Sequence, residues 1–147
     1  MNPTKQTTVL VAEDDADDRL LIQKAFAKSW GDGKLIYVEN GEELVKYLKR
    51  QAPYASEKEY PRPQIVLLDL NMPKKDGRQA LKEIKADQEL CKIPVIVLTT
   101  SRQPDDIEHM YKLGSNSYIT KPSSFEGLLT IAKEIEVYWF RTVELPV

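Results

Sequence analysis

The sequence predicts an α/β fold in which a parallel five-stranded sheet carries helices on both faces. Short apolar runs recur along the chain and alternate with segments whose apolar residues stand three or four positions apart. A continuous apolar run is typical of a parallel strand covered on both faces, and the helical spacing is typical of the covering helices. Most of these runs end directly at charged or hydroxyl-bearing residues, which indicates a functional site at one edge of the sheet.

Size and composition favour one globular domain. The chain has 147 residues, of which 41% are hydrophobic and 30% are charged, and its formal net charge is −2. A nucleic-acid surface usually needs a basic stripe and a membrane span needs roughly 20 consecutive apolar residues, so neither is expected. The N-terminal sequence has no signal-peptide core. Cys91 is the only cysteine and His109 the only histidine, which excludes an internal disulfide and a Cys/His metal cluster. A chain without disulfides is suited to a reducing compartment, so we expect the protein in the cytoplasm.

Five short apolar runs are predicted to be strands. They lie at residues 7–12, 35–38, 65–68, 93–98 and 117–120. Residues 1–6 are polar and are expected to be disordered, so residues 7–147 form the predicted single domain, with a C-terminal helix and a short tail.

The segments between the strands are predicted to be helices with recognisable ends. The first begins at the acids of residues 14–18, because negative charge is favourable at a helix N-terminus, and ends near residues 30–33. We interpret Asp15, Asp17 and Asp18 as helix-start residues only. The later helices lie around residues 44–48, 79–87 and 104–113, and after Ser123 or Ser124. The polar segment 51–63 is longer than a usual αβ loop of about 2–6 residues. It is either a surface excursion, which we favour, or a partner contact.

A flavodoxin-like doubly wound sheet with strand order 2-1-3-4-5 fits this alternation, because crossovers between parallel strands are right-handed. Its switch point lies between the first and third strands, where Glu13 and Asp14 meet Asp69. Thr99 and Lys121 follow the fourth and fifth strands, so we expect all five side chains in one pocket. Asp69 alone could be an ordinary polar residue that leaves a strand, but chance is a poor explanation for four such endings.

The chemistry of this pocket indicates phosphoryl transfer. Adjacent carboxylates repel by about 4 kcal/mol at 4 Å and a dielectric near 20, so a cation is expected between them. An oxygen-only ligand set suits Mg²⁺, to which the backbone carbonyl of Asn71 could add another oxygen. Asp69 is the candidate nucleophile, with Lys121 and Thr99 on the transferred oxygens. Lys121 could instead form a simple salt bridge to the acids, and the two roles are compatible when no phosphoryl group is bound.

Four motifs, in this order and spacing, resemble the receiver domain of two-component response regulators. They are Val-Leu-Val-Ala-Glu13-Asp14-Asp15, Leu-Leu-Asp69-Leu-Asn71-Met-Pro, Val-Leu-Thr99-Thr100-Ser and Tyr118-Ile-Thr-Lys121-Pro122. The resemblance covers nearly the whole chain. It implies a CheY-like form of the fold and a phosphorelay in which Asp69 accepts phosphate from a phosphohistidine of a sensor histidine kinase.

The resemblance also assigns roles to the other residues of the pocket. It implies that Glu13, Asp14, Asp69 and the Asn71 carbonyl hold Mg²⁺, with Glu13 in the place of the more usual aspartate and reaching the metal through water. It implies that Thr99 and Lys121 contact the phosphoryl group. On activation Thr99 would shift and Tyr118 would turn inward, which changes the surface of the fourth helix, fifth strand and last helix. A cis Lys121–Pro122 bond is implied as well.

Two segments resemble the small single-domain regulators paired with bacterial and cyanobacterial phytochromes. They are the stretch with Tyr60-Pro61-Arg62-Pro63 and the ending from Ile135 to Pro146. The resemblance makes a bacteriophytochrome one candidate for the partner kinase, and another histidine kinase remains open.

The C-terminal sequence points to output through protein contacts, because no effector domain is recognisable after the last helix. Leu128, Ile131, Ile135 and either Tyr138 or Trp139 are expected to form its inward stripe. Val137, Phe140 and Val143 lie mostly on other faces, and such an apolar excess often marks an association surface. We therefore expect a homodimer through this region. The alternative is that the tail folds back onto its own domain.

Two other functions compete with that of a phosphoacceptor that assists its own phosphorylation and dephosphorylation. A phosphohydrolase of the haloacid dehalogenase type would need a second acid two residues after Asp69, where this chain has Asn71. A receiver-like adaptor that is never phosphorylated would not need the complete set of pocket residues. The sequence therefore favours a signalling protein over an enzyme.

Overall fold

The computed structural model describes residues 7–30 and 33–146, and it contains a five-stranded parallel sheet in the order β2-β1-β3-β4-β5. This confirms the predicted fold class. The strands are β1 (Thr8–Ala12), β2 (Lys34–Val38), β3 (Ile65–Leu68), β4 (Val95–Thr99) and β5 (Ser117–Thr120). The prediction of disorder for residues 1–6 lies outside the described residues, as does part of the helix end predicted at residues 30–33.

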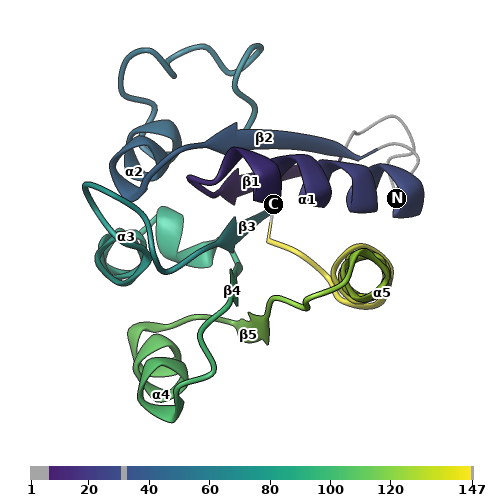
Figure 1. Cartoon of the computed structure of the whole chain (residues 1–147). Coiled ribbons are helices and arrows are strands. Elements are labelled where there is room, and N and C mark those ends of the chain that lie inside the picture. The colour runs from purple at the N-terminus through teal and green to yellow at the C-terminus, as the bar shows by residue number, and fades with distance from the viewer. Residues whose placement is uncertain (1–6, 31–32, 147) are drawn as a thin grey trace.

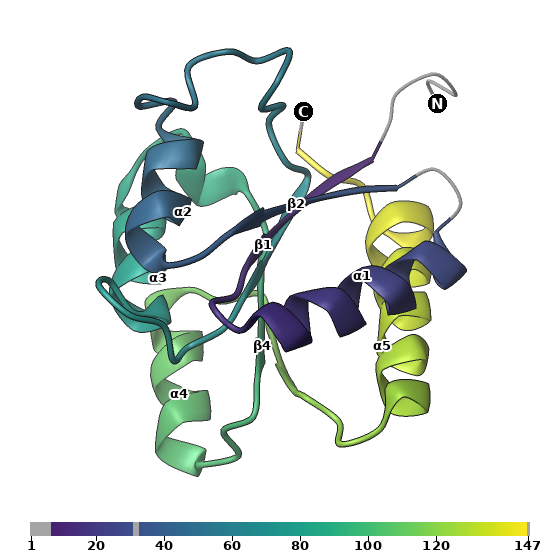
Figure 2. The same ribbon diagram turned by 45° about the horizontal axis from the view of Figure 1, so that its top comes forward.

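Helices cover both faces of the sheet (Figures 1 and 2). They are α1 (Ala16–Ser29), α2 (Gly41–Leu48), α3 (Gly77–Ala86), α4 (Pro104–Leu113) and α5 (Phe125–Val137). Helices α1 and α5 lie side by side on one face, and α2, α3 and α4 lie on the other (Figure 2). A short 3₁₀ turn, η1 (Leu90–Lys92), precedes β4, and a π-helical turn, η2 (Tyr138–Thr142), continues α5. Within the described residues, no helix has the length and hydropathy needed to cross a bilayer.

The sheet separates two apolar cores because successive side chains of a strand point to opposite faces. In β1, Val9 and Val11 pack against α1 and α5, whereas Leu10 and Ala12 pack against α2 and α3. All five residues of β1 are buried. This two-sided burial explains why the strands are continuous apolar runs, and it leaves only the strand ends free to carry polar groups.

The loop after β3 is held by glycine at a close backbone approach. Gly77 begins α3 and donates its N–H to the carbonyl of Leu70 at 2.9 Å. A Cβ atom at Gly77 would overlap the carbonyl oxygen of Asp69, so only glycine fits there without a shift of the backbone. The first residue of α3 therefore packs against the backbone of Asp69 and holds it in place.

The long connection from α2 to β3 is a surface segment pinned to α2, which agrees with the interpretation that we favoured. The ring of Tyr54 lies 5.2 Å from that of Tyr47 and 5.0 Å from that of Tyr60, between centroids. The Tyr47 hydroxyl donates to the carbonyl of Pro61 at 2.7 Å, and the Tyr54 hydroxyl donates to Glu43 at 2.6 Å. Figure 1 shows this segment looping away beyond α2.

The C-terminal tail folds back onto its own domain through Phe140. The Phe140 ring lies 5.2 Å from that of Trp30, whose indole N–H donates to the carbonyl of Ala132 at 2.9 Å. Phe140 therefore belongs to the edge of the core beneath α1 and α5, and not to an unassigned apolar surface. Val137 and Tyr138 remain 42% and 53% exposed.

Two local expectations from the sequence differ from the structure. The implied cis Lys121–Pro122 bond is wrong: it is trans, the lower-energy form of most X–Pro bonds, and the cis bond of the described chain is Ala52–Pro53. The fourth strand begins two residues later than predicted. Ile93 closes η1 by donating its N–H to the carbonyl of Leu90 at 3.0 Å, and Pro94 has no N–H for a ladder.

Candidate functional site

Side chains from four strand ends meet at the carboxyl edge of the sheet. Glu13 and Asp14 follow β1, Asp69 follows β3, Thr99 ends β4 and Lys121 follows β5. One carboxylate oxygen from each of the three acids lies within 4.8 Å of those from the other two. The expected convergence of these residues is therefore present, because neighbouring parallel strands end at the same edge.

Lys121 links the acids by ion pairs. Its Nζ donates to Glu13, to Asp18 Oδ2 at 2.9 Å and to Asp69 Oδ2 at 3.5 Å. The exposed fractions of the side chains are 11% for Lys121, 11% for Asp69 and 2% for Glu13. Charges this deeply buried are stable only when they are paired. In this structure Lys121 therefore forms the simple salt bridge to the acids.

Asp18 is a member of the site that the sequence analysis missed. Asp15 has the expected helix-start role, since its carboxylate caps α1 by accepting from the N–H groups of Asp17 and Asp18 at 2.8 and 3.1 Å. Asp18 in addition pairs with Lys121. A signal was available: Asp18 stands four residues before the buried Ile22 and so shares the inward stripe of α1, where an acid needs a partner.

The protonation of the site reflects this crowding of acids. Burial raises the pKa of Glu13 to about 7; the hydrogen bond from Lys121 offsets part of the rise, and the Asp69 carboxylate adds to it. Burial alone would lower the pKa of Lys121, but its hydrogen bonds to Glu13 and Asp18 and the charge of Asp69 together raise it. Even with Lys121 in place, the carboxylates lack compensating positive charge. An all-oxygen set with this deficit fits a divalent cation.

Thr99 contributes a hydroxyl that has no partner. The residue is fully buried, and its Oγ1 makes no hydrogen bond to any described part of the chain. A buried hydroxyl without a partner is costly, which marks a position where a bound group would supply the missing contact. Asn71, whose carbonyl was the expected extra ligand, is exposed, and its N–H points to Asp69 Oδ1 at 3.5 Å.

Tyr118 belongs to a hydrogen-bonded chain that runs from β5 to α3. Its hydroxyl donates to the carbonyl of Ser101 at 2.9 Å, and the Ser101 hydroxyl donates to Asp106 at 2.5 Å. Arg78 donates to the same carboxylate at 2.9 Å. The Ser101 hydroxyl, followed by Arg78, lowers the pKa of Asp106. The loop after Thr99 is thus tied to both α4 and α3, which the sequence did not predict.

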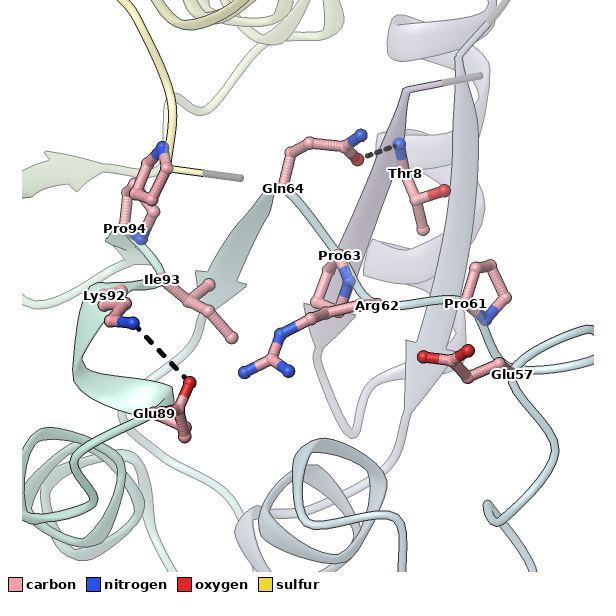
Figure 3. Close-up of a pocket in the computed structure, with 11 residues that line it drawn as sticks. Thr8, Glu57, Pro61, Arg62, Pro63, Gln64, Glu89, Lys92, Ile93 and Pro94 are labelled. Atoms are coloured by element: carbon pink, nitrogen blue, oxygen red, sulfur yellow. Dashed lines mark hydrogen bonds and ion pairs between the residues drawn. The ribbon is translucent and has the colours of Figure 1, made fainter. Parts of the chain in front are cut away.

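A cavity lies at the opposite edge of the sheet, near the amino ends of β1, β3 and β4. Figure 3 shows its lining, and the volume is about 420 Å³. The N–H of Thr8 donates to Gln64 Oε1 at 2.6 Å, and Lys92 stands 3.6 Å from Glu89 in an exposed pair. Acids and bases balance in this lining, and none of the predicted site residues reaches it.

Comparisons with known proteins agree with this geometry. Residues 9–133 match the family model of the response regulator receiver domain. Response regulator Rcp1 of Synechocystis sp. is 41% identical over 145 residues, which cover 99% of this chain and 95% of that protein.

Two solved structures show the same fold. That of the phosphorylated cyanobacterial phytochrome response regulator RcpA has a TM-score of 0.90 and 43% identity, and the match covers 97% of this chain and 100% of that one. That of the Mn²⁺-bound form of Rcp1 has a TM-score of 0.85 and 40% identity, and the match covers 96% of this chain and 99% of that one. The chain therefore belongs to the response regulator receiver family.

Proposed function

We propose that the protein is the receiver of a two-component phosphorelay, in which Asp69 accepts a phosphoryl group from a phosphohistidine of a sensor histidine kinase. The observation that supports this most directly is the surrounding of the buried Asp69 carboxylate. It has two acids on one side, Lys121 within 3.5 Å and the unpartnered hydroxyl of Thr99 on the adjacent strand. Acceptance of a phosphoryl group would give each of these groups a role.

The acids are proposed to hold Mg²⁺. Asp14 and Asp69 would bind it directly, Glu13 through water, and the carbonyl of Asn71 would add a neutral oxygen. The bound ion would supply positive charge against the oxygens of the transferred group. The Mn²⁺-bound form of the relative Rcp1 supports a divalent ion at this kind of site.

The chain's own residues would then act on the transferred group. A carboxylate oxygen of Asp69 forms the new bond to phosphorus while the bond between phosphorus and the histidine nitrogen breaks, and the imidazole leaves. Lys121 neutralises one phosphoryl oxygen and Thr99 donates to another. Loss of the phosphoryl group to water restores the carboxylate, so the protein is a reversible phosphoacceptor that assists both steps.

Phosphorylation is proposed to signal through the surface formed by α4, β5 and the C-terminal helix. A shift of Thr99 toward the phosphoryl group would pull on the loop that holds Ser101, and Tyr118 is bonded to that loop at 2.9 Å. A bistable element of this kind can be biased by the added charge of about −1.5 to −2. We propose that this surface, with the exposed Tyr138 and Val137, mediates homodimer formation.

We propose that residues 7–147 act as one receiver domain in the cytoplasm and that a bacteriophytochrome is the partner kinase. The relative RcpA, a phytochrome response regulator, supports this choice of kinase. A phosphohydrolase is disfavoured because Asn71 occupies the position of the second acid. An unphosphorylated adaptor is disfavoured because every residue of the pocket is present.

The test is incubation with Mg²⁺ and acetyl phosphate, followed by intact-mass measurement. We expect one phosphoryl group per chain, labile to hydroxylamine and absent from an Asp69→Asn variant. Continuous turnover of phosphate monoesters would instead indicate an enzyme. If no label is taken up from acetyl phosphate or from a phosphorylated phytochrome kinase, the adaptor is the better description.

A further inference from the structure

Lys121 has one partner that does not come from a strand end. Asp18 lies on α1, and its Oδ2 is 2.9 Å from Lys121 Nζ, whereas Asp69 Oδ2 is 3.5 Å away. The ammonium group therefore stands closer to α1 than to the proposed phosphoacceptor. Asp18 is also the most exposed of the three carboxylates, at 39% of its side chain.

The donors of Lys121 are fully used in this arrangement. An ammonium group has three N–H donors, and Glu13, Asp18 and Asp69 together take all three. A phosphoryl oxygen that binds Lys121 must enter this set and draw Nζ toward Asp69. Of the three contacts, the one to Asp18 costs least to give up, because its carboxylate can return to water.

We propose that Asp18 is a positioning residue that competes with the phosphoryl group for Lys121 and so opposes phosphorylation of Asp69. This rests on the proposed function of Asp69 as the phosphoacceptor. Asp18 stabilises the unphosphorylated arrangement through its ion pair, and its carboxylate repels the added negative charge. Both effects have the same sign, so removal of the Asp18 charge favours the phosphorylated state.

The structure provides room for this exchange. A hollow of about 130 Å³ between α1 and α5 is lined by both Asp18 and Lys121, together with Leu21, Pro122 and Phe125. A change of rotamer in either charged side chain therefore meets open space and not the packed core. The exchange needs no movement of α1 itself.

Asp17 offers a matched control. It stands beside Asp18 in the first turn of α1 and carries the same charge, but its side chain is exposed, and Lys121 pairs with Asp18 in the described structure. Asp17→Asn and Asp18→Asn remove the same charge from the same helix turn. Any difference between the two variants therefore reports the contact with Lys121.

The first experiment titrates the wild type and both variants with beryllofluoride, a mimic of the phosphoryl group on a carboxylate, at saturating Mg²⁺. We expect Asp18→Asn to bind the mimic about two- to fivefold more tightly than the wild type, as for loss of a partly exposed ion pair. Asp17→Asn should match the wild type. Equal affinities of the two variants, or weaker binding by Asp18→Asn, would overturn the proposal.

A second readout follows Lys121 without any phosphoryl group. Acetylation of lysines by a succinimidyl ester, mapped by peptide mass, should label Lys121 faster in Asp18→Asn than in Asp17→Asn; equal rates in the two variants would count against the contact. Wild-type protein that takes up neither the mimic nor phosphate would contradict the proposed function, and this inference would fall with it. If the wild type binds beryllofluoride and the two variants bind it with equal affinity, the role of Asp18 is contradicted while the function of Asp69 stands.

Discussion

The sites at the two ends of the sheet differ in the chemistry of the residues that line them. At the carboxyl ends, the buried Glu13 and Asp69 and the exposed Asp14 crowd together: one carboxylate oxygen from each lies within 4.8 Å of those from the other two. At the amino ends, the cavity of about 420 Å³ has four prolines in its lining and charged residues that face solvent (Figure 3). In this lining the backbone N–H of Thr8 donates to the Gln64 side chain.

The difference lies in whether the buried polar groups of each lining have partners. Burying an acid costs several kcal/mol unless a partner or a bound ion compensates, so a fold retains such a cluster when it is used. The site at the carboxyl ends has a raised Glu13 pKa and an orphaned Thr99 hydroxyl, both of which a bound ion or group would correct. Among the described residues that line the cavity at the amino ends, no buried side-chain atom lacks a hydrogen-bond partner.

The largest expected effect is on phosphoryl uptake, which a change at the carboxyl ends of the strands should abolish and a change at the amino ends should not. Asp69→Asn removes the proposed nucleophile and should abolish labelling from acetyl phosphate with Mg²⁺, measured by intact mass. Arg62→Ala, in the opposite cavity, should be labelled like the wild type, because Arg62 lies on the surface far from Asp69 along the strands. Labelling of Asp69→Asn at an unchanged level would remove the distinction between the ends.

The next effect is on stability. Lys121→Met leaves the buried Glu13 and Asp69 carboxylates without their cation, and breaking a buried pair in this way typically costs about 3 kcal/mol. We expect a loss of this size in the free energy of unfolding, measured with urea at neutral pH without Mg²⁺. Adding Glu13→Gln to Lys121→Met should recover part of the loss. If Lys121→Met unfolds at the same urea concentration as the wild type, Lys121 does not stabilise the buried carboxylates.

Stability without metal should also depend on pH through Glu13. Its pKa is about 7 in the folded protein and 4.5 as the ordinary value. Between these values the folded state binds more protons than the unfolded state, so the free energy of unfolding falls as pH rises and levels off above about 7.

Urea unfolding at several pH values checks this dependence. The matched variant is Glu13→Gln, which should lose the slope in this window. An equal slope in the variant would assign the dependence to other groups.

The sequence predicted the pocket well because one rule determines it. Parallel strands end at a common edge, so Asp69 and Lys121 must converge once their strands are recognised. Asp18 was missed because an acid in a first helical turn already has an explanation, and only its place on the inward stripe of α1 argues otherwise. The pair of Arg78 and Asp106 depends on how α3 lies against α4. No local pattern encodes that arrangement.

The smallest expected effect is a loss of stability from a change in the cavity at the amino ends of the strands. Gln64→Ala leaves the N–H of the buried Thr8 without its acceptor, which should cost about 1 kcal/mol in the free energy of unfolding. Phosphoryl uptake should stay at the wild-type level, because the change strains the start of β1 and not its carboxyl end. Arg62→Ala is the control of the same lining and should leave both quantities unchanged. A loss of phosphoryl uptake in Gln64→Ala at temperatures where the variant is folded would show that the two ends are coupled through β1, and the cavity would then belong to the signalling machinery.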